Sequence, residues 1–518
     1  MGCAKLIAGG LILRPKRRLA PLKGSTTMTT PHKVSAPAVR CTKIVATLGP
    51  ASTSADTIAA LLAAGMNVVR INGSHGDHAT HAKTIATVRE QAKLAKCSVG
   101  ILFDLQGPKI RIGKFSGPAK QIAAQQVFSL AVNREAEEGE LPADYAYLDR
   151  DVKVGDPLLI NDGSLASEVI HVEPGLVRCR ALHPGQIDQR KGINLPQTQV
   201  SAPPVTDKDR QDAIFAVEQN VDMIAMSFVR RASDVLELKE VIAKAGAHTP
   251  IISKIEKPQA LDNLEEILQV SWGVMVARGD LGVELSAADV PMAQKRIIRE
   301  ANRLCKPVIT ATQMLDSMTR NPQPTRAEAS DVANAVLDGT DAVMLSQETA
   351  SGTYPVESVA MMVRIINAVE RQHQVDPIHR RRERGSNEIP AAIAAAGCEV
   401  AHHLSARAIV VFTESGRMAL LTSQRRPNTP IIAFAADPNL RNRLCLIWGV
   451  QSFLGAPAKS MEERMKGLDD VLIHENLAKQ NDRFVLLVGG PNAPTGSTNL
   501  MVVHKVGTKN TMLPIREH

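Results

Sequence analysis

Charged side chains lie near the C-terminal ends of two apolar stretches that have the character of buried strands. Lys254 and Glu256 end the stretch over residues 251–256, and Asp280 follows the apolar residues 273–277. Lysine and carboxylate side chains are rarely buried without partners, so we expect these three to face one another at a shared site. The structural alternative is that the two carboxylates only form ion pairs with Lys254.

Further polar residues fall at the ends of other strand-like runs. Eight runs, over residues 42–48, 67–71, 99–105, 223–229, 251–255, 273–277, 307–311 and 342–345, alternate with amphipathic stretches of helical period. This alternation predicts an α/β fold, a closed parallel (β/α)8 TIM barrel. An open doubly wound sheet is the alternative, but no Gly-x-Gly-x-x-Gly follows the first strand. One mouth of the barrel would gather Arg70, Asn72, Ser74, His75, Asp104, Lys254, Glu256, Asp280, Thr312 and Ser346.

The barrel pattern is interrupted between residues 112 and 203. Valine alternation and Gly/Asp turns there predict a small inserted β-barrel domain. It would hang over the mouth, and hinges at Gly107-Pro108 and Pro203-Pro204 would let it close as a lid that excludes water. The barrel then comprises residues 41–111 and 204–373. Residues 374–518 begin with a charged linker over 376–387 and predict an open-sheet α/β domain.

The net charge of +8 is concentrated in the N-terminal segment. Residues 1–43 hold nine of the 61 basic residues and no acid, which leaves 52 basic against 53 acidic residues. A nucleic-acid footprint would be confined to this segment, so we expect no nucleic-acid partner. We interpret residues 1–40 as a disordered basic extension; an organelle transit peptide within residues 1–27 and a true start at Met28 are the alternatives.

Two classes of protein are not expected from the composition. No apolar run reaches the roughly 18 residues that a membrane span needs, so we expect no membrane partner. The seven cysteines are odd in number and form no CxxC pair, which argues against a disulfide framework or a zinc site and fits a reducing cytoplasm.

Longer motifs carry a family resemblance. In order along the chain they are TKIVATLGP (42–50), NGSHG (72–76), DLQGPKIR (104–111), KGINLP (191–196), ISKIE (252–256), MVARGDLG (275–282), ATQMLDSM (311–318) and PTRAEASDVANAVLDG (324–339). From Thr42 to the C-terminus the chain resembles pyruvate kinase. The resemblance implies Mg²⁺-dependent transfer of a phosphoryl group from phosphoenolpyruvate to ADP, giving pyruvate and ATP in the last step of glycolysis. It also implies a homotetramer, with residues 374–518 as the domain for regulation and oligomerisation.

The resemblance assigns roles to residues at the mouth. Lys254 would stabilise the transferring phosphoryl group and the developing enolate oxygen, because preorganised positive charge does most of the work in phosphoryl transfer. Glu256 and Asp280 would bind Mg²⁺, or Mn²⁺ in its place. Catalysis is assigned to Lys254, Thr312, Arg70 and Ser346, and substrate binding to Arg70, Lys254, Gly279, Asp280 and Thr312. Nucleotide contacts are assigned to Arg70, Asn72, His75, Arg111 and Lys191.

The sequence departs from the family pattern at the monovalent-cation site. Members that require potassium hold it with an Asn, a Ser, an Asp and a Thr. Asn72, Ser74 and Asp104 match, but Leu105 stands where the Thr would be, and Lys109 replaces the glutamate that accompanies potassium dependence. We expect activity without potassium, with the Lys109 ammonium as an internal cation. A solvated charge at the lid hinge is the alternative role for Lys109.

A further motif lies in the C-terminal domain. Thr413, Ser415 and Gly416 resemble the family's effector-phosphate loop, but Glu414 adds a negative charge and the segment over residues 491–498 is short. Fructose 1,6-bisphosphate is therefore a poor fit, while a sugar monophosphate, AMP or no effector remain open.

Two rival functions are a Mg²⁺-dependent lyase or aldolase of pyruvate or phosphoenolpyruvate, and a non-catalytic protein that binds nucleic acid through its basic head.

Overall fold

The structure is a computed structural model that describes residues 40–196, 198–375, 388–455, 461–489 and 498–507. Nearly all of the predicted basic extension, the whole predicted linker, and residues 490–497 of the short C-terminal segment lie outside the described residues. Within the described part of the chain, no helix is long and apolar enough to cross a membrane.

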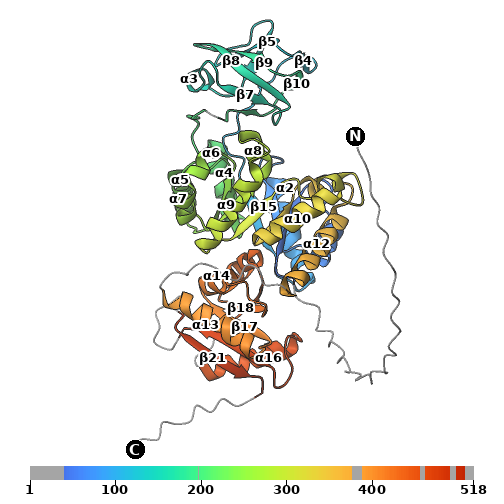
Figure 1. Cartoon of the computed structure of the whole chain (residues 1–518), viewed down its shortest axis with the longest axis vertical. Helices are drawn as coiled ribbons and strands as arrows, with labels where there is room; N and C mark the ends of the chain where they lie inside the picture. The colour runs from blue at the N-terminus through green and yellow to red at the C-terminus, as the bar shows by residue number, and fades with distance from the viewer. Residues whose placement is uncertain (1–39, 197, 376–387, 456–460, 490–497, 508–518) are drawn as a thin grey trace, which may run out of the picture. The chain divides into compact units, whose positions relative to one another are not determined.

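Eight parallel strands close into a barrel, as predicted, and Figure 1 shows helices around it. Around the ring the order is β1-β16-β15-β14-β13-β12-β3-β2, and β1 closes it by pairing Lys43 with Ala342 of β16. The strands are β1 (Lys43–Leu48), β2 (Val68–Asn72), β3 (Gly100–Asp104), β12 (Met223–Met226), β13 (Ile251–Ile255), β14 (Gly273–Ala277), β15 (Val308–Ala311) and β16 (Ala342–Leu345).

Apolar residues on both sides of these strands explain their closure. One set, including Leu102, Ile252 and Met275, fills the barrel interior, and a larger set packs against the surrounding helices. Strands buried on both faces are nearly continuous hydrophobic runs, which is why the runs could be found in the sequence. The helices between them are α1 (Ala55–Ala64), α2 (His78–Leu94), α4 (Asp207–Glu218), α5 (Ala232–Lys244), α7 (Leu264–Val270), α9 (Val290–Arg303), α10 (Arg326–Asp338) and α12 (Pro355–Val375).

Short elements surround the mouth and turn the chain away from the strands. They are α6 (Pro258–Asp262), α8 (Arg278–Glu284), the 3-10 helix η1 (Asp316–Thr319) and α11 (Gln347–Ala350). Helices α4 and α10 begin at side-chain caps: the Thr206 side chain accepts from Asp209 N, and the Thr325 side chain accepts from Glu328 N. Each cap satisfies an otherwise unpaired N–H group and so fixes where the helix starts.

The inserted segment is mostly β structure: a six-stranded sheet and a separate pair of strands. Residues 111 and 112 join the two edges of the six-stranded sheet, since Arg111 bridges Gly192 beside β11 and Ile112 bridges Ala143 of β6. One sheet has the order β11-β7-β8-β9-β5-β6, and a separate pair joins β10 to β4. Its own buried core includes Leu130, Leu158 and Val177. The elements are β4 (Lys120–Ile122), β5 (Val127–Val132), β6 (Glu140–Ala143), α3 (Leu148–Asp151), β7 (Pro157–Ile160), β8 (Leu165–Glu173), β9 (Leu176–Ala181), β10 (Gly185–Ile187) and β11 (Ile193–Asn194).

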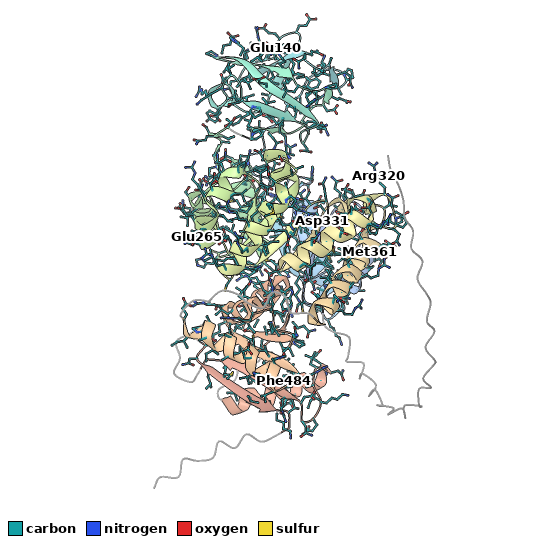
Figure 2. All side chains as sticks on the ribbon, viewed as in Figure 1. Glu140, Glu265, Arg320, Asp331, Met361 and Phe484 are labelled. Carbon is teal, nitrogen blue, oxygen red and sulfur yellow. The ribbon has the colours of Figure 1, made fainter. Side chains whose placement is uncertain are left out.

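The C-terminal segment contains the predicted open α/β sheet. Five strands have the order β19-β18-β17-β20-β21, and only β21 is antiparallel to its neighbour. Phe484 of β20 is fully buried in this layer (Figure 2). The elements are α13 (Ile389–His403), β17 (Ala408–Thr413), α14 (Arg417–Gln424), β18 (Ile431–Ala435), α15 (Pro438–Arg443), η2 (Leu444–Leu446), β19 (Val450–Leu454), α16 (Met461–His474), β20 (Arg483–Val488) and β21 (Leu500–Lys505). The sequence did not predict β19, because this edge strand is mostly half-exposed and lacks a continuous apolar run.

Candidate active site

Lys254, on β13, lies at the centre of a buried charge cluster at the barrel mouth. Its Nζ atom lies 2.9 Å from Glu256 Oε1 and 3.4 Å from Asp104 Oδ1, and it donates a hydrogen bond to Ser227 Oγ at 2.7 Å. Only 9% of Lys254 is exposed. The structure therefore brings together the ends of β3, β12 and β13, as the positions of these residues predict.

Opposite charges in the cluster act against the effect of burial and favour the charged forms of Lys254 and Asp104. Burial works against the charged form of Lys254, but the carboxylates of Asp104 and Glu256 raise its pKa overall. Burial also opposes the ionised form of Asp104, yet Lys254 and Arg70 hold its pKa below the ordinary value. For Glu256 burial has the largest effect and raises the pKa, although Lys254 works against it.

Arg70, on β2, completes the cluster on the side of β1 and β3. Its Nε and Nη2 atoms both lie 2.7 Å from Asp104 Oδ2, and Nη1 donates to Thr47 Oγ1 at 3.1 Å. Two nitrogens engage one carboxylate, which holds the guanidinium plane at the mouth. The remaining N–H groups of this fork can bind phosphate oxygens.

Two carboxylates have the chemistry of a divalent-cation site. Glu256 Oε2 accepts from Phe228 N at 2.7 Å, while Oε1 is buried with no hydrogen bond of good geometry and only the ionic contact with Lys254. Asp280, in the first turn of α8, is close enough to add to the rise in the Glu256 pKa. Mg²⁺ typically takes one or two protein carboxylates and keeps several waters. The pair therefore fits Mg²⁺, and no group of three or more His, Cys, Asp or Glu that could hold a metal occurs among the described residues.

Gly279 and Thr312 meet at the start of α8. A Cβ atom added at Gly279 would lie 2.7 Å from Thr312 Cγ2, so only glycine allows this approach. Thr312 itself has a φ of +77°, which is a strained conformation for a β-branched residue. Arg278 holds the strained backbone, since it donates to Ala311 O at 3.2 Å and to Thr312 O at 2.7 Å. Asp331 of α10, labelled in Figure 2, anchors Arg278 by an ion pair at 2.7 Å.

Ser346 lies at the N-terminal cap of α11, but its side chain makes no cap hydrogen bond. The backbone there is held by Glu348, whose carboxylate accepts from Ser346 N at 2.7 Å and from Leu315 N at 3.1 Å. Burial raises the pKa of Glu348, while these N–H donors work in the opposite direction. The Ser346 hydroxyl therefore is not used as a cap, which was the structural role that a serine at a strand end most often has.

Asn72, Ser74 and Asp104, expected at the monovalent-cation site, are neighbours: Asn72 of β2 lies opposite Asp104 of β3, and Gly73 N donates to Asp104 O at 2.8 Å. Asn72 Oδ1 accepts from Ser74 N at 3.2 Å, and Asp104 is engaged by Arg70 and Lys254. Lys109 was expected here as the internal cation. Its Nζ atom instead pairs with Asp280 Oδ1 at 3.5 Å, and among the described residues it makes no ion pair with Asp104.

The expected nucleotide contacts come from two parts of the chain. Arg70, Asn72 and the exposed His75 belong to the end of β2 and the loop after it. Arg111 and Lys191 belong to the two chain segments that enter and leave the inserted domain, where Arg111 pairs with Gly192 and Ile112 N donates to Lys191 O at 2.8 Å. Arg111 Nη1 donates to Arg190 O at 3.0 Å. The structure thus groups Arg111 with Lys191, and Arg70 with Asp104 and Lys254.

Two family models match this chain, one over the barrel with its insertion and one over the C-terminal domain. The family models described as "Pyruvate kinase, barrel domain" and "Pyruvate kinase, alpha/beta domain" match residues 39–359 and 391–504. The chain belongs to the pyruvate kinase family. It is thus a phosphotransferase, and neither the lyase or aldolase alternative nor a non-catalytic nucleic-acid-binding protein is favoured.

Relatives named pyruvate kinase match over most of their length. The protein from Geobacillus stearothermophilus is 44% identical over 473 residues, which are 90% of this chain and 80% of the relative. The protein from Mycobacterium tuberculosis is 42% identical over 90% of this chain and 98% of its own. The crystal structure of a pyruvate kinase from Cryptosporidium parvum has a TM-score of 0.84 and 36% identity, and the match covers 90% of this chain and 96% of that one.

Four residues of this pyruvate kinase-family site were missed in the sequence. Ser227 follows β12 and Thr47 lies on β1, so the rule that polar residues at strand ends line the mouth would have found both. Arg278 lies inside the motif over residues 275–282, but the sequence does not indicate that an arginine there donates to the backbone carbonyl of Thr312. Glu284 is 4% exposed and accepts from Lys257 Nζ at 2.6 Å and Asn194 Nδ2 at 2.9 Å, a link between barrel and insertion that no local pattern reveals.

Proposed function

We propose that the barrel mouth transfers the phosphoryl group of phosphoenolpyruvate to ADP, with the roles assigned below. The observation that carries the proposal is the Lys254 ammonium, held 2.9 Å from Glu256 and kept charged by two buried carboxylates. A fixed, buried positive charge is worth most where negative charge develops during a reaction. Lys254 would lie against the transferring phosphoryl group and the enolate oxygen.

Glu256 and Asp280 would hold Mg²⁺ in this proposal. The metal, when bound, would neutralise phosphate and enolate charge beside the lysine. The buried Oε1 atom of Glu256 supports this role, because it has a free lone pair and no hydrogen-bond donor of good geometry. Mn²⁺ has the same preference for oxygen ligands and would serve in its place.

The other mouth residues would bind and orient the substrates. Arg70 would bind the phosphoryl oxygens, and the first N–H groups of α8 at Gly279 and Asp280, with the Thr312 hydroxyl, would bind the substrate carboxylate. The unused hydroxyl of Ser346 would join Thr312 in delivering a proton to the enolate. The nucleotide would contact the residues Arg70, Asn72, His75, Arg111 and Lys191, so that closure of the inserted domain over the mouth completes the site.

Potassium independence is a finer part of the proposal. Leu105 is apolar and 2% exposed where a cation ligand would be needed, and Asp104 is already neutralised by Arg70 and Lys254. Lys109 places a positive charge 3.5 Å from Asp280, beside the proposed metal site. Assays in tetramethylammonium buffer should therefore retain activity. A large loss when potassium is left out would contradict this part alone.

The remaining assignments concern the whole chain. We propose that residues 41–111 and 204–373 form the catalytic barrel, residues 112–203 the lid, and residues 374–518 a regulatory and oligomerisation domain. A cytoplasmic homotetramer and a phosphorylated effector at the loop of Thr413, Ser415 and Gly416 belong to the same proposal. In this loop Gly416 N donates to Thr413 Oγ1 at 2.9 Å, so the Thr413 hydroxyl helps to shape it.

The experiment that tests the reaction is a coupled assay. Pyruvate release would be followed with lactate dehydrogenase while phosphoenolpyruvate, ADP and Mg²⁺ are each omitted in turn. We expect pyruvate only when all three are present, with ATP formed in equal amount. Pyruvate formed without ADP would instead indicate a lyase or a phosphatase and would refute the proposal.

A further inference from the structure

The last turn of helix α8 holds a buried carboxylate that joins the barrel to the inserted domain. Glu284 ends α8, and its side chain is fully buried. Its Oε1 atom accepts two hydrogen bonds, from Lys257 Nζ at 2.6 Å and from Asn194 Nδ2 at 2.9 Å. Lys257 directly precedes α6 of the barrel, and Asn194 lies on strand β11 of the insertion. We call these three residues the carboxylate link.

Each part of the carboxylate link is close in sequence to a residue with a proposed role at the mouth. Helix α8 carries Asp280, and Lys257 directly follows Glu256. These two carboxylates are the proposed Mg²⁺ ligands. Strand β11 begins two residues after Lys191, a proposed nucleotide contact. The carboxylate link therefore joins the metal side of the site to the nucleotide side.

A second approach shows that the inserted sheet lies against the same end of α8. Gly163 belongs to the turn between β7 and β8, and a Cβ atom added there would lie 3.8 Å from Val283 Cγ1. Strands β7 and β11 are neighbours in this sheet, since Ile193 pairs with Ile160. One edge of the inserted sheet thus approaches the last two residues of α8.

The carboxylate link gains little net stability from its hydrogen bonds. Glu284 Oε2 and Asn194 Oδ1 are both buried, and neither has a hydrogen-bond partner in the described part of the chain. Acceptors that are buried without a donor are unfavourable and offset the bonds made by Oε1. A contact with a small net gain can break and re-form when the inserted domain moves. It would therefore follow the position of the lid without holding it permanently.

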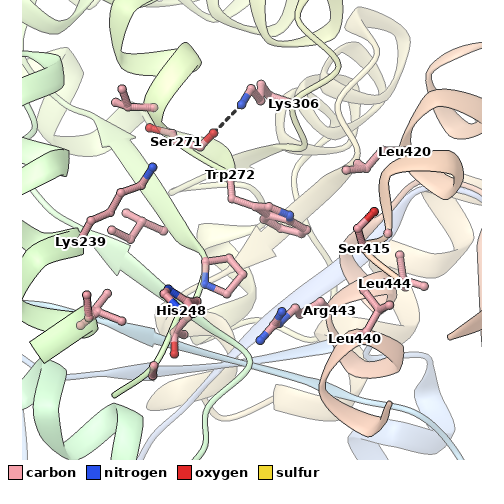
Figure 3. Close-up of a pocket in the computed structure, with 18 of the residues that line it drawn as sticks. Lys239, His248, Ser271, Trp272, Lys306, Ser415, Leu420, Leu440, Arg443 and Leu444 are labelled. Carbon is pink, nitrogen blue, oxygen red and sulfur yellow. Dashed lines mark hydrogen bonds between the residues drawn. The ribbon is translucent and has the colours of Figure 1, made fainter. Parts of the chain in front are cut away.

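The carboxylate link is remote from the cavity at the other end of the barrel. Ile251, the first residue of β13, lines a cavity of about 570 Å³ together with Trp272 and Ser415 (Figure 3). Strand β13 has five residues and spans about 16 Å, so the two sites lie at opposite ends of it. Neither Asn194 nor Glu284 lines that cavity. Substitutions in the carboxylate link consequently report on the mouth alone.

We propose that Asn194 and Glu284 are positioning residues that couple nucleotide binding to the metal and substrate side of the mouth. When the nucleotide draws the inserted domain over the mouth, Asn194 donates to Glu284 and holds α8. This helix has seven residues, about 10 Å, so its last turn fixes where Asp280 lies in its first. The coupling is reciprocal: phosphoenolpyruvate tightens ADP binding by the same factor as ADP tightens phosphoenolpyruvate binding. The inference rests on the proposed roles of the lid and of α8.

Binding measurements on the full-length protein test this coupling. The Kd of ADP would be measured by calorimetry in Mg²⁺, with and without saturating phospholactate, an analogue of phosphoenolpyruvate that lacks the double bond and so yields no enolate. In the natural protein we expect phospholactate to tighten ADP binding by about fivefold or more. In Asn194→Ala this ratio should fall to about one, because the inserted domain no longer holds α8. The ion pair between Lys257 and Glu284 remains in this variant.

Two further variants separate the hydrogen bond from packing and from the insertion at large. Asn194→Asp has the same size but no donor, and it faces Glu284 with a like charge, so it should lower the ratio as much as Asn194→Ala does. Gln121→Ala removes an exposed amide on β4 of the inserted domain and should keep the ratio of the natural protein. A merely structural role of Asn194 would weaken ADP binding equally with and without phospholactate.

The ratio decides the proposal in every case. A ratio of about one in the natural protein, an unchanged ratio in both Asn194 variants, or an equal loss in Gln121→Ala overturns it. If Asn194→Ala does not fold, Asn194→Asp alone decides. The titrations need no turnover, so they test the carboxylate link separately from the coupled assay, which tests the reaction.

Discussion

At the scale of single residues, the site depends on a lysine that stays charged although it is buried. An isolated ammonium in such a place would lose its proton, but Asp104 and Glu256 compensate for the lost water. The same argument explains why the sequence was informative. A lysine and a glutamate that end an apolar strand need partners, and the partners are found where neighbouring strands end. The strained Thr312 backbone was not predictable, because its φ depends on Arg278 and on contacts distant in sequence.

Replacing Lys254 with Met tests the proposed charge. We expect kcat to fall by about 10²–10³-fold, since one preorganised group is lost. The free energy of unfolding should also fall by about 3–5 kcal/mol, because Glu256 is left as a buried charge without its partner. Steady-state kinetics and thermal unfolding measure the two effects. Lys244→Met is the matched control on an exposed helix end, and an unchanged kcat in folded Lys254→Met protein would remove Lys254 from the mechanism.

At the scale of elements, helix α8 carries the substrate-binding backbone only if it lies close against Thr312. Gly279→Ala would place a methyl group 2.7 Å from Thr312 Cγ2. Overpacking of this kind costs about 1–3 kcal/mol, so kcat/KM for phosphoenolpyruvate should fall by about tenfold or more.

A second glycine of the same helix provides the control for this change. A Cβ atom at Gly282 would lie 3.4 Å from Val290 Cγ2, which is an ordinary contact. Gly282→Ala should therefore retain kcat/KM. Equal effects of the two substitutions would show that helix α8 itself, and not its contact with Thr312, responds to the added methyl group.

A strand could be predicted from the sequence where its own residues form a continuous apolar run. The bounds of β13, β14 and β16 agree with the apolar runs in the sequence, because both faces of these strands are buried. The inserted domain was recognisable as β structure, but its pairing was not. Neighbours such as β5 and β9, or β11 and β7, are chosen by contacts between distant residues, so alternation along one strand does not determine them.

At the scale of the whole molecule, a buried lysine joins the barrel to the C-terminal sheet. Lys43 Nζ, at the start of β1, donates to Val450 O of β19 at 2.7 Å. Burial lowers the pKa of Lys43 from its ordinary value of 10.5 to about 8. A lowered pKa means that the folded protein releases this proton more readily than the unfolded chain does.

The consequence is a defined pH dependence of stability. Between pH 8 and pH 10.5 the unfolded chain keeps a proton on Lys43 that the folded protein has lost. The contribution of Lys43 to the free energy of unfolding therefore rises with pH across that window, by about 3 kcal/mol in all. Below pH 8 the destabilising effect of burying the charged lysine is fully present. Other groups, such as the Cys445 thiol whose pKa burial raises to about 11, change stability in the opposite direction.

Comparison with Lys43→Met isolates the lysine from those other groups. The unfolding free energy of the natural protein minus that of the variant should increase between pH 8 and pH 10.5, as measured by urea denaturation. Lys83→Met, on the exposed side of α2, controls for the loss of one surface charge. Parallel pH curves for the natural protein and Lys43→Met would contradict the prediction.

The pairing that closes the barrel also bears on how a nascent chain acquires this fold. Lys43 of β1 cannot meet Ala342 of β16 until some 300 further residues have left the ribosome, whereas every pair in the inserted sheets lies within residues 120–194. At a translation rate of roughly 5–20 residues per second, the edge of β1 that pairs with β16 has no partner for about 15–60 s. A polypeptide that terminates before Ala342 lacks β16, so its barrel strands keep two unsatisfied edges, which are templates for aggregation. Quality control during translation would therefore act on the barrel long after the inserted sheets are complete.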